Sequence, residues 1–372
     1  MMIVRRYLAR EIIVAAVFVL LAFLVLFAFL EVVGELENIN NRGYQLQQVM
    51  YYVLLNQPQH VYELLPIATL IGAVYTLAQM AARSEFTILR MSGLDTRLLI
   101  SLLLQVGIPF AVLTFVVGEW VAPEMSRYAE QYRMQAREQM VAQDFRTGLW
   151  IRDAQATAQG RVTSFINFGQ VHPDNSIDRI RIYNFDEQFH LQTYLEAEHG
   201  EYLPPNQWRL LNATRTDFDN RDPTQPVSGM KTVKIPEQVW QSRLHPDILS
   251  VLLVSPEKMS ALSLVNYIRH LRSNLQKSNR YEIAFWNKLA YPLALFVMIT
   301  LALPFAYLQV RSGSVSLKIF TGIMIGVFFH LLNSLFWHVG VLNTWPPFLT
   351  AILPGVLMLM LTLVALRWVE RR

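Results

Sequence analysis

The sequence predicts an α-helical polytopic membrane protein with six transmembrane helices and one inserted all-β, jelly-roll-like domain. Two observations lead to this fold class. Hydrophobic residues make up 53% of the 372 residues and charged residues only 16%, and the long charge-free segments form two groups, one toward each end of the chain. A polar region with strand-like alternation, within residues 123–280, separates the two groups.

Three charge-free segments near the start of the chain predict the first three transmembrane helices. They run from Ile12 to Leu30, from Leu64 to Ala82 and from Leu98 to Gly118. A helix rises about 1.5 Å per residue and the hydrocarbon core of a bilayer is about 30 Å thick, so each segment is long enough for one crossing. No small-residue cleavage motif follows the first segment, so we expect it to be retained as an anchor.

Two further charge-free segments predict the last three helices. One runs from Leu289 to Val310, and the other, from Ile319 to Leu366, is too long for a single crossing. The segment 343–347 divides it, because its two prolines lack a backbone donor and the residue before a proline avoids the helical conformation. Six crossings are therefore expected.

Basic residues beside these segments predict the orientation. If the N-terminus is inside, eleven of them flank the inner ends of the crossings, whereas the short outer loops contain only Arg42. Such a bias places both termini in the cytoplasm and the polar region outside. The eleven are Arg5, Arg6, Arg10, Arg83, Arg90, Arg97, Arg311, Lys318, Arg367, Arg371 and Arg372.

The polar region predicts an antiparallel β domain. Leu191, Thr193, Leu195 and Ala197 alternate with more polar residues, which is the period of a strand with one buried face. Short strands separated by turns favour a sandwich or jelly roll over a parallel sheet; the alternative is a small β domain that only stabilises the membrane part. Further strands are expected near residues 148–153, 161–168, 177–185, 207–216 and 227–235.

Two helices are expected beside the β domain. Residues 125–140 should continue the third crossing outward. Residues 260–277 place apolar side chains at helical spacing on one face, with Arg269 and Arg272 elsewhere. An amphipathic helix directly before a crossing is expected to lie along the membrane surface.

Catalytic motifs and metal-ligand sets are missing from the sequence. It contains no GxxxxGK, HExxH or GxSxG motif, and its zero cysteines exclude disulfides, cysteine-bound zinc and thiol catalysis. His330, in the fifth crossing, has no carboxylate partner and is more typical of a packing hydrogen bond than of a functional site. We therefore expect no catalytic residues, cofactor or metal, and no nucleic-acid partner.

The segment between the second and third crossings predicts a short amphipathic helix. Ser84 is its expected N-cap, Gly93 follows its end, and Asp95 is expected to cap the next crossing. Phe86 and Leu89 share one face. A cytoplasmic helix of this design could be bound by an ATP-hydrolysing partner; the alternative is a connector that rests on the lipid.

An ordered set of short motifs resembles that of a known family. The motifs are Arg83-Ser84-Glu85 with Ser92-Gly93, Gly118-Glu119-Trp120-Val121-Ala122-Pro123, Gly148-Leu149-Trp150 and Asp247-Ile248-Leu249-Ser250. With the layout of three crossings, a β domain and three crossings, the whole chain resembles the lipopolysaccharide export permeases of the LptF/LptG family, and their G branch more closely. None of the motifs is diagnostic alone.

The resemblance implies a permease subunit of an ABC transporter. Such a subunit would extract lipopolysaccharide from the bacterial inner membrane and pass it to a periplasmic bridge protein, together with a paralogous six-span permease and a cytoplasmic ATPase dimer. The implied domains are residues 1–122, with crossings one to three and a coupling helix at 83–93, residues 123–280, with the periplasmic β domain and its flanking helices, and residues 281–372, with crossings four to six.

The resemblance also implies two sets of site residues. Similar proteins can carry a lysine near the outer end of the first crossing that meets lipid phosphates; Glu31 stands here instead, which leaves Arg133 and Arg137 as better candidates. The expected ATPase-coupling residues are Arg83, Glu85, Phe86, Leu89, Arg90 and Gly93. The expected lipid-binding residues are Phe27, Glu31, Arg133, Arg137 and Phe328.

Other function classes fit the sequence less well. A membrane-embedded enzyme would need converging polar residues, and only isolated His and Glu residues occur in or beside the crossings. A sensor would need a cytoplasmic output domain, for which the inner segments are too short. The alternative to a permease is therefore an extracytoplasmic sensor or a scaffold subunit without its own transport path.

Overall fold

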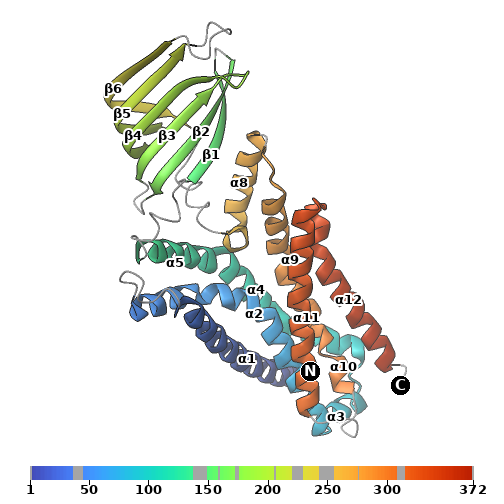
Figure 1. Cartoon of the computed structure of the whole chain (residues 1–372). Helices are drawn as coiled ribbons and strands as arrows, with labels where there is room; N and C mark the ends of the chain where they lie inside the picture. Colours follow the sequence, from blue (N-terminus) through green and yellow to red (C-terminus); the bar gives the residue numbers. More distant parts are fainter. Residues whose placement is uncertain are drawn as a thin grey trace.

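The computed structural model describes residues 2–36, 45–136, 149–157, 160–171, 176–204, 207–219, 229–242, 255–274, 276–307 and 315–370. Figure 1 shows a bundle of long helices that carries a curved sheet at one end. Both termini and the short helix α3 (Glu85–Met91) lie at the other end. Three crossings before the inserted domain and three after it place both termini at the end opposite the sheet.

Among the described residues, six helices are long and apolar enough to cross a membrane, which confirms the expected number. The two prolines of segment 343–347 lie where the fifth of these helices gives way to the sixth. The helices of the crossings are α1 (Met2–Leu36), α2 (Leu46–Ala82), α4 (Thr96–Val116), α9 (Asn279–Leu301) with the short α10 (Pro304–Tyr307), α11 (Val315–Leu342) and α12 (Pro347–Glu370).

The second crossing is longer than the sequence predicted. We expected it to begin at Leu64, but α2 begins at Leu46 and contains Glu63. The sequence prediction began after Glu63 because it assumed that every residue of a crossing faces lipid, where a charge is costly. In the structure α2 packs against α1, α5 (Ala122–Ala136), α9 and α11, so its polar residues face protein.

The third crossing bends where it leaves the bundle. Helix α4 passes into a π-helical turn, η1 (Val117–Val121), and continues as α5. Figure 1 shows α5 running across the direction of α9 and α11. The expected outward continuation is therefore present as far as Ala136; its remainder, residues 137–140, lies outside the described residues.

The inserted domain contains all six strand segments that the alternation predicted. They form one antiparallel sheet in which neighbours in sequence are neighbours in space. The described strands therefore make a single curved sheet rather than the two facing sheets of a sandwich, because no strand crosses over to a second layer. The strands are β1 (Leu149–Thr157), β2 (Gly160–Val171), β3 (Ile177–Phe185), β4 (Leu191–Leu203), β5 (Gln207–Asp219) and β6 (Gly229–Gln241).

Curvature gives the sheet a buried inner face. Trp208 and Phe168 are almost fully buried there, together with isoleucines from β1 to β3. The register between β3 and β4 shifts at Phe185, and Asn212 in β5 has a φ of 52°, an irregularity of the kind that bends a strand. A single sheet can bury its apolar residues when it curls around them.

The helix that follows the β domain was placed wrongly by the sequence. We expected it to lie along the membrane surface, but Figure 1 shows α8 (Ala261–Ser273) running alongside the first turns of α9. Its buried side chains Leu264, Tyr267 and Leu271 pack with Ala284 of α9. Protein therefore covers the face of α8 that carries Leu264, Tyr267 and Leu271, whereas Leu262, at the start of the helix, is 71% exposed.

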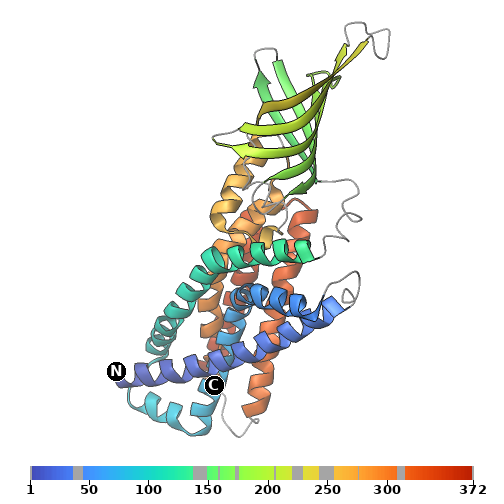
Figure 2. The same cartoon turned by 90° about the vertical axis from the view of Figure 1, so that its left-hand side faces the viewer.

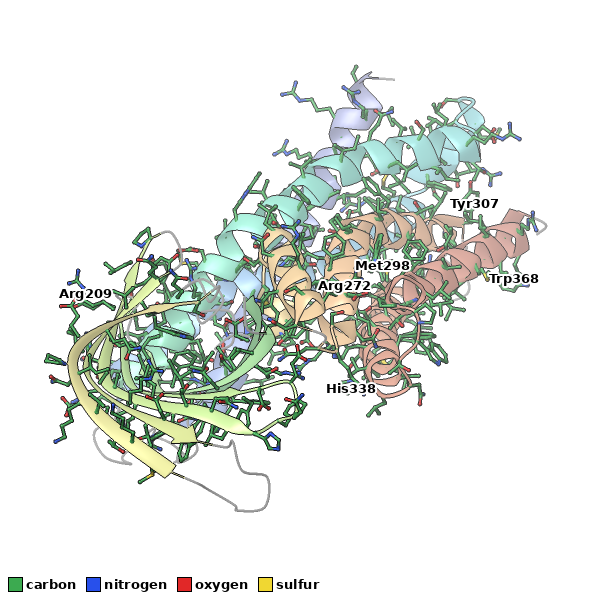
Figure 3. All side chains as sticks on the ribbon, turned by 90° about the horizontal axis from the view of Figure 1, so that it is seen from above. Arg209, Arg272, Met298, Tyr307, His338 and Trp368 are labelled. Atoms are coloured by element: carbon green, nitrogen blue, oxygen red, sulfur yellow. The ribbon has the colours of Figure 1, made fainter. Side chains whose placement is uncertain are left out.

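Three elements converge at one side of the bundle. Figure 2 shows α1 and α5 extending sideways in the same direction, with the start of α2 beside them. Val49, Tyr52 and Ala129 form a small buried cluster between them. Seen from above, Met298 lies amid the helices and is fully buried, whereas Trp368 lies at their periphery and is half exposed (Figure 3).

Candidate functional site

Helix α3, the expected coupling segment, ends as the sequence predicted but begins differently. Gly93 has a φ of 94°, and the Gly93 and Leu94 amides donate to the Arg90 and Leu89 carbonyls, which is the glycine-ended helix terminus that the sequence predicted. Ser84 stands at the N-cap position, but its φ is 60° and its side chain makes no cap hydrogen bond. Asp95 accepts from the Thr96 amide, as expected of a cap.

Three of the expected coupling residues hold α3 against the bundle. Phe86 is 3% exposed and packs edge-on against the Tyr307 ring, with 5.1 Å between the ring centroids. Leu89 packs against the same core. The Arg90 guanidinium also lies over the Tyr307 ring, 4.9 Å from its centroid. These residues hold α3 in place, and Phe86 has almost no exposed surface.

Glu85 is also bound within the chain. The Tyr7 hydroxyl of α1 donates to its carboxylate at 3.1 Å, and an Arg83 guanidinium nitrogen lies at 3.9 Å. About a third of the Glu85 side chain remains exposed. The carboxylate therefore links α3 to α1 and still presents an edge outward.

The outward face of α3 consists of residues that the sequence analysis did not select. Ile88 is 65% exposed and Met91 is 85% exposed. Their spacing of three residues places them on one face, opposite Phe86 and Leu89. Assigning Phe86 and Leu89 to the core side would have identified Ile88 and Met91 from the sequence.

At the opposite end of the bundle, Glu31 joins α1 to α2. Its carboxylate accepts from the Asn56 amide at 2.5 Å and lies 3.2 Å from Nε2 of His60. The Phe27 ring lies 5.4 Å from the His60 ring. Lys258 reaches the Asn56 oxygen at 3.3 Å. Glu31 is thus held by partners within the chain, and the sequence analysis missed these partners because they lie far away in sequence.

Arg133 of α5 lies beside this group, between two carboxylates. It contacts Glu130 at 2.5 Å and Glu35 at 3.5 Å, and its guanidinium lies 5.4 Å from the centre of the Tyr52 ring. About a third of its side chain is exposed, so it can still meet a ligand. Arg137 lies outside the described residues. We call Glu31, Glu35, Asn56, His60 and Arg133 the outer cluster.

Phe328 and Glu257 lie outside the outer cluster. Phe328 of α11 is 55% exposed, on a different helix from Phe27. The short turn η2 (Pro256–Lys258) places Lys258 beside Asn56 of the outer cluster. Burial raises the pKa of the Glu257 carboxyl in the same turn. The structure therefore unites Glu31 and Arg133 at one edge of the bundle and leaves Phe328 on a separate apolar surface.

Comparisons with known proteins agree on one family. The profile described as "Lipopolysaccharide export system permease LptF/LptG" matches residues 6–368. The chain is 30% identical over 360 residues to "Lipopolysaccharide export system permease protein LptG" of Escherichia coli strain K12, and 26% identical over 357 residues to the protein of the same name from Haemophilus influenzae. Each alignment covers 96% of this chain and 96% of the relative.

Proposed function

This chain belongs to the LptF/LptG family of lipopolysaccharide export permeases, and from this membership we propose that it acts as one of two permease subunits in an ATP-driven exporter. Membership of this family supports a role in the export of lipopolysaccharide from the inner membrane. The partners, the orientation and the residue roles that follow are proposals that rest on the geometry of this chain.

The termini and α3 are proposed to face the cytoplasm and the sheet the periplasm. The basic residues near the termini and α3 support this orientation, as does the position of the sheet at the far end (Figure 1). The absence of cysteine from the chain permits a direct test. Asn343→Cys should react with a membrane-impermeant maleimide in sealed cells and Ser92→Cys should not; the reverse pattern would invert the orientation.

A separate ATPase dimer is proposed to dock on the outward face of α3. The exposed Ile88 and Met91 give it an apolar contact, and the free edge of Glu85 gives it a polar one. Phe86 and Tyr307 then pass the force to the bundle, because they pack α3 onto α10. This division of roles explains how a helix of seven residues can transmit movement without bending away.

The ATPase contact is tested by Met91→Asp. Burial of a methionine contributes about 1.5–3 kcal/mol, so its replacement by a charge should weaken ATPase binding at least about tenfold. Met230→Asp, at a methionine of β6 that is 68% exposed, is the control. Glu85→Lys should likewise release the ATPase. Normal co-purification of the ATPase with Met91→Asp would exclude this docking face.

Lipopolysaccharide is proposed to pass along the apolar surfaces of α1 and α11 toward the outer cluster. Phe27 and Phe328 provide apolar contacts, and Arg133 is the cation that can meet a phosphate. Glu31 contributes indirectly, because Asn56 and His60 already hold its carboxylate. A periplasmic bridge protein would then receive the lipid near the β domain.

Photo-crosslinking tests this path. A photoreactive amino acid at position 27 or 328 should crosslink to lipopolysaccharide in the reconstituted complex, and one at Leu77, which is fully buried, should not. An Arg133→Glu/Arg137→Glu variant should lose lipid-stimulated ATP hydrolysis, because a charge-assisted contact to a phosphate is worth about 1.5–3 kcal/mol. Crosslinks to protein alone, with unchanged stimulation, would instead support the scaffold alternative.

A further inference from the structure

The bend in the third crossing holds the start of α8 through one carboxylate. Glu119 lies in the π-helical turn η1, and its two oxygens accept from the backbone amides of Ala261 at 2.8 Å and Leu262 at 3.3 Å. The first amides of a helix have no partner within the helix and attract negative charge. Ser260, the N-cap, accepts from the Ser263 amide. Glu119 therefore completes the cap of α8 from 142 residues away.

The fourth crossing also binds the segment that leads into α8. Lys288 of α9 is 7% exposed, and its ammonium group donates to the Met259 carbonyl oxygen at 2.5 Å. It lies 5.2 Å from the centre of the Tyr62 ring of α2 and within electrostatic reach of Glu119 and Glu63. A buried ammonium requires such partners, because an unpaired buried charge is costly. Residues 259–262 are therefore held by two crossings at once.

Tyr62 of α2, in the second crossing, packs against both the third and the fourth crossing. A Cβ added at Gly118 would come within 2.5 Å of the Tyr62 ring, so only glycine allows η1 to lie this close to α2. The Tyr62 ring packs 4.9 Å from that of Tyr291 in α9, whose hydroxyl donates to the Glu63 carbonyl. Three crossings thus meet in one contact at the base of α8.

From this geometry we infer that Glu119 and Lys288 form a joint that transmits movements of the third and fourth crossings to the connection carrying the β domain. The joint grips the chain where the segment from the β domain enters α8, so a shift of either crossing moves that entry point. The π-helical turn is what brings the Glu119 carboxylate to it, in keeping with the frequent use of such turns at functional positions. The transport role of the joint rests on the proposed function.

Distance measurements between spin labels test the joint without any transport assay. The cysteine-free chain can be labelled at Ile108→Cys on α4 and Arg269→Cys on α8, both at exposed positions. Glu119→Ala and Lys288→Met should broaden the distance distribution between these labels, whereas Glu119→Gln, which keeps one acceptor, should broaden it less. The matched control is Glu124→Ala, because the Glu124 carboxylate binds the nearby Arg127 of the same helix. An unchanged distribution in Glu119→Ala would overturn the joint.

A second measurement separates a transmitting joint from a merely structural one. In the reconstituted complex, Glu119→Ala should hydrolyse ATP at the wild-type rate but release at least fivefold less lipopolysaccharide per ATP, with its midpoint of thermal unfolding close to that of Glu124→Ala. Equal release per ATP in Glu119→Ala and wild type would refute transmission. If the wild-type complex itself released no lipopolysaccharide, the proposed function would fail, while the distance result would still decide the joint.

Discussion

The first two crossings have almost the same length and opposite surroundings. Helix α1 has 35 residues and α2 has 37, yet 11% of the most apolar 18-residue stretch of α1 is buried within the chain, against 83% for α2. Helix α1 is purely apolar over this stretch, whereas the charge-free part of α2, from Leu64 to Ala82, includes Thr69, Thr76 and Gln79. The difference shows that a crossing accepts polar residues when neighbouring helices, rather than lipid, surround it.

The two helices also serve different roles in the proposed transporter. Helix α2 packs against α1, α5, α9 and α11 and also contacts α3, α4 and α10, so changes in it should destabilise the fold. Helix α1 exposes a continuous apolar surface, which suits contact with lipid or with a second permease. Paired substitutions at equivalent residue types in the two helices can test this contrast.

The largest effect is expected from Gly72→Leu in α2. A Cβ at Gly72 would lie 2.5 Å from the backbone nitrogen of Ala16, and backbone cannot move aside as a side chain can. Overpacking of this kind should cost about 3 kcal/mol or more and separate α1 from α2. The yield of monodisperse protein in detergent should fall sharply. Gly34→Leu in α1, with nothing within 4 Å, is the control and should behave as wild type.

Truncation of a buried leucine should give the next largest effect. Leu70 of α2 is fully buried, so Leu70→Ala should lower the free energy of unfolding by about 2–5 kcal/mol. Leu26 of α1 is 48% exposed, and Leu26→Ala should cost less than about 1 kcal/mol. Reversible unfolding in mixed micelles compares the two. Equal losses would mean that α1 is as tightly packed as α2.

The polar contact between the two helices should contribute less. Glu31→Ala leaves Asn56 and His60 without their shared acceptor, which should cost about 1–3 kcal/mol. Glu11→Ala, at an exposed carboxylate of the same helix, is the control. Unfolding curves at one pH measure both. If the two variants are equally stable, the Glu31 contact does not hold α1 to α2.

The smallest effect on stability is expected at the exposed surface of α1. Val25 is 72% exposed, so a spin label at Val25→Cys should change the free energy of unfolding by less than about 0.5 kcal/mol. Its accessibility to oxygen dissolved in the bilayer should be high in the isolated chain. A drop in accessibility on addition of the second permease would assign this surface to the partner, and no change would assign it to lipid.

The joint and the outer cluster show where sequence reasoning ended. Sequence reasoning singled out Glu31 and Arg133 because of their position beside the crossings, but not His60 or Lys258, because hydrogen-bond partners 29 and 202 residues apart leave no local pattern. It named Glu119 only as part of the motif at residues 118–123 and assigned it no contact. The structure instead places Glu119 against the α8 amides.

The sequence by itself determined the six crossings, the six strand segments and the glycine that ends α3. Each depends on a local constraint: the thickness of the bilayer, the alternation of side chains along a strand and the left-handed conformation of Gly93. Only the tertiary structure decided that the strands form one curved sheet, that Phe86 faces inward and Met91 outward, and that Glu119 caps α8. These features depend on which surfaces pack together, and packing joins residues that the chain itself keeps far apart.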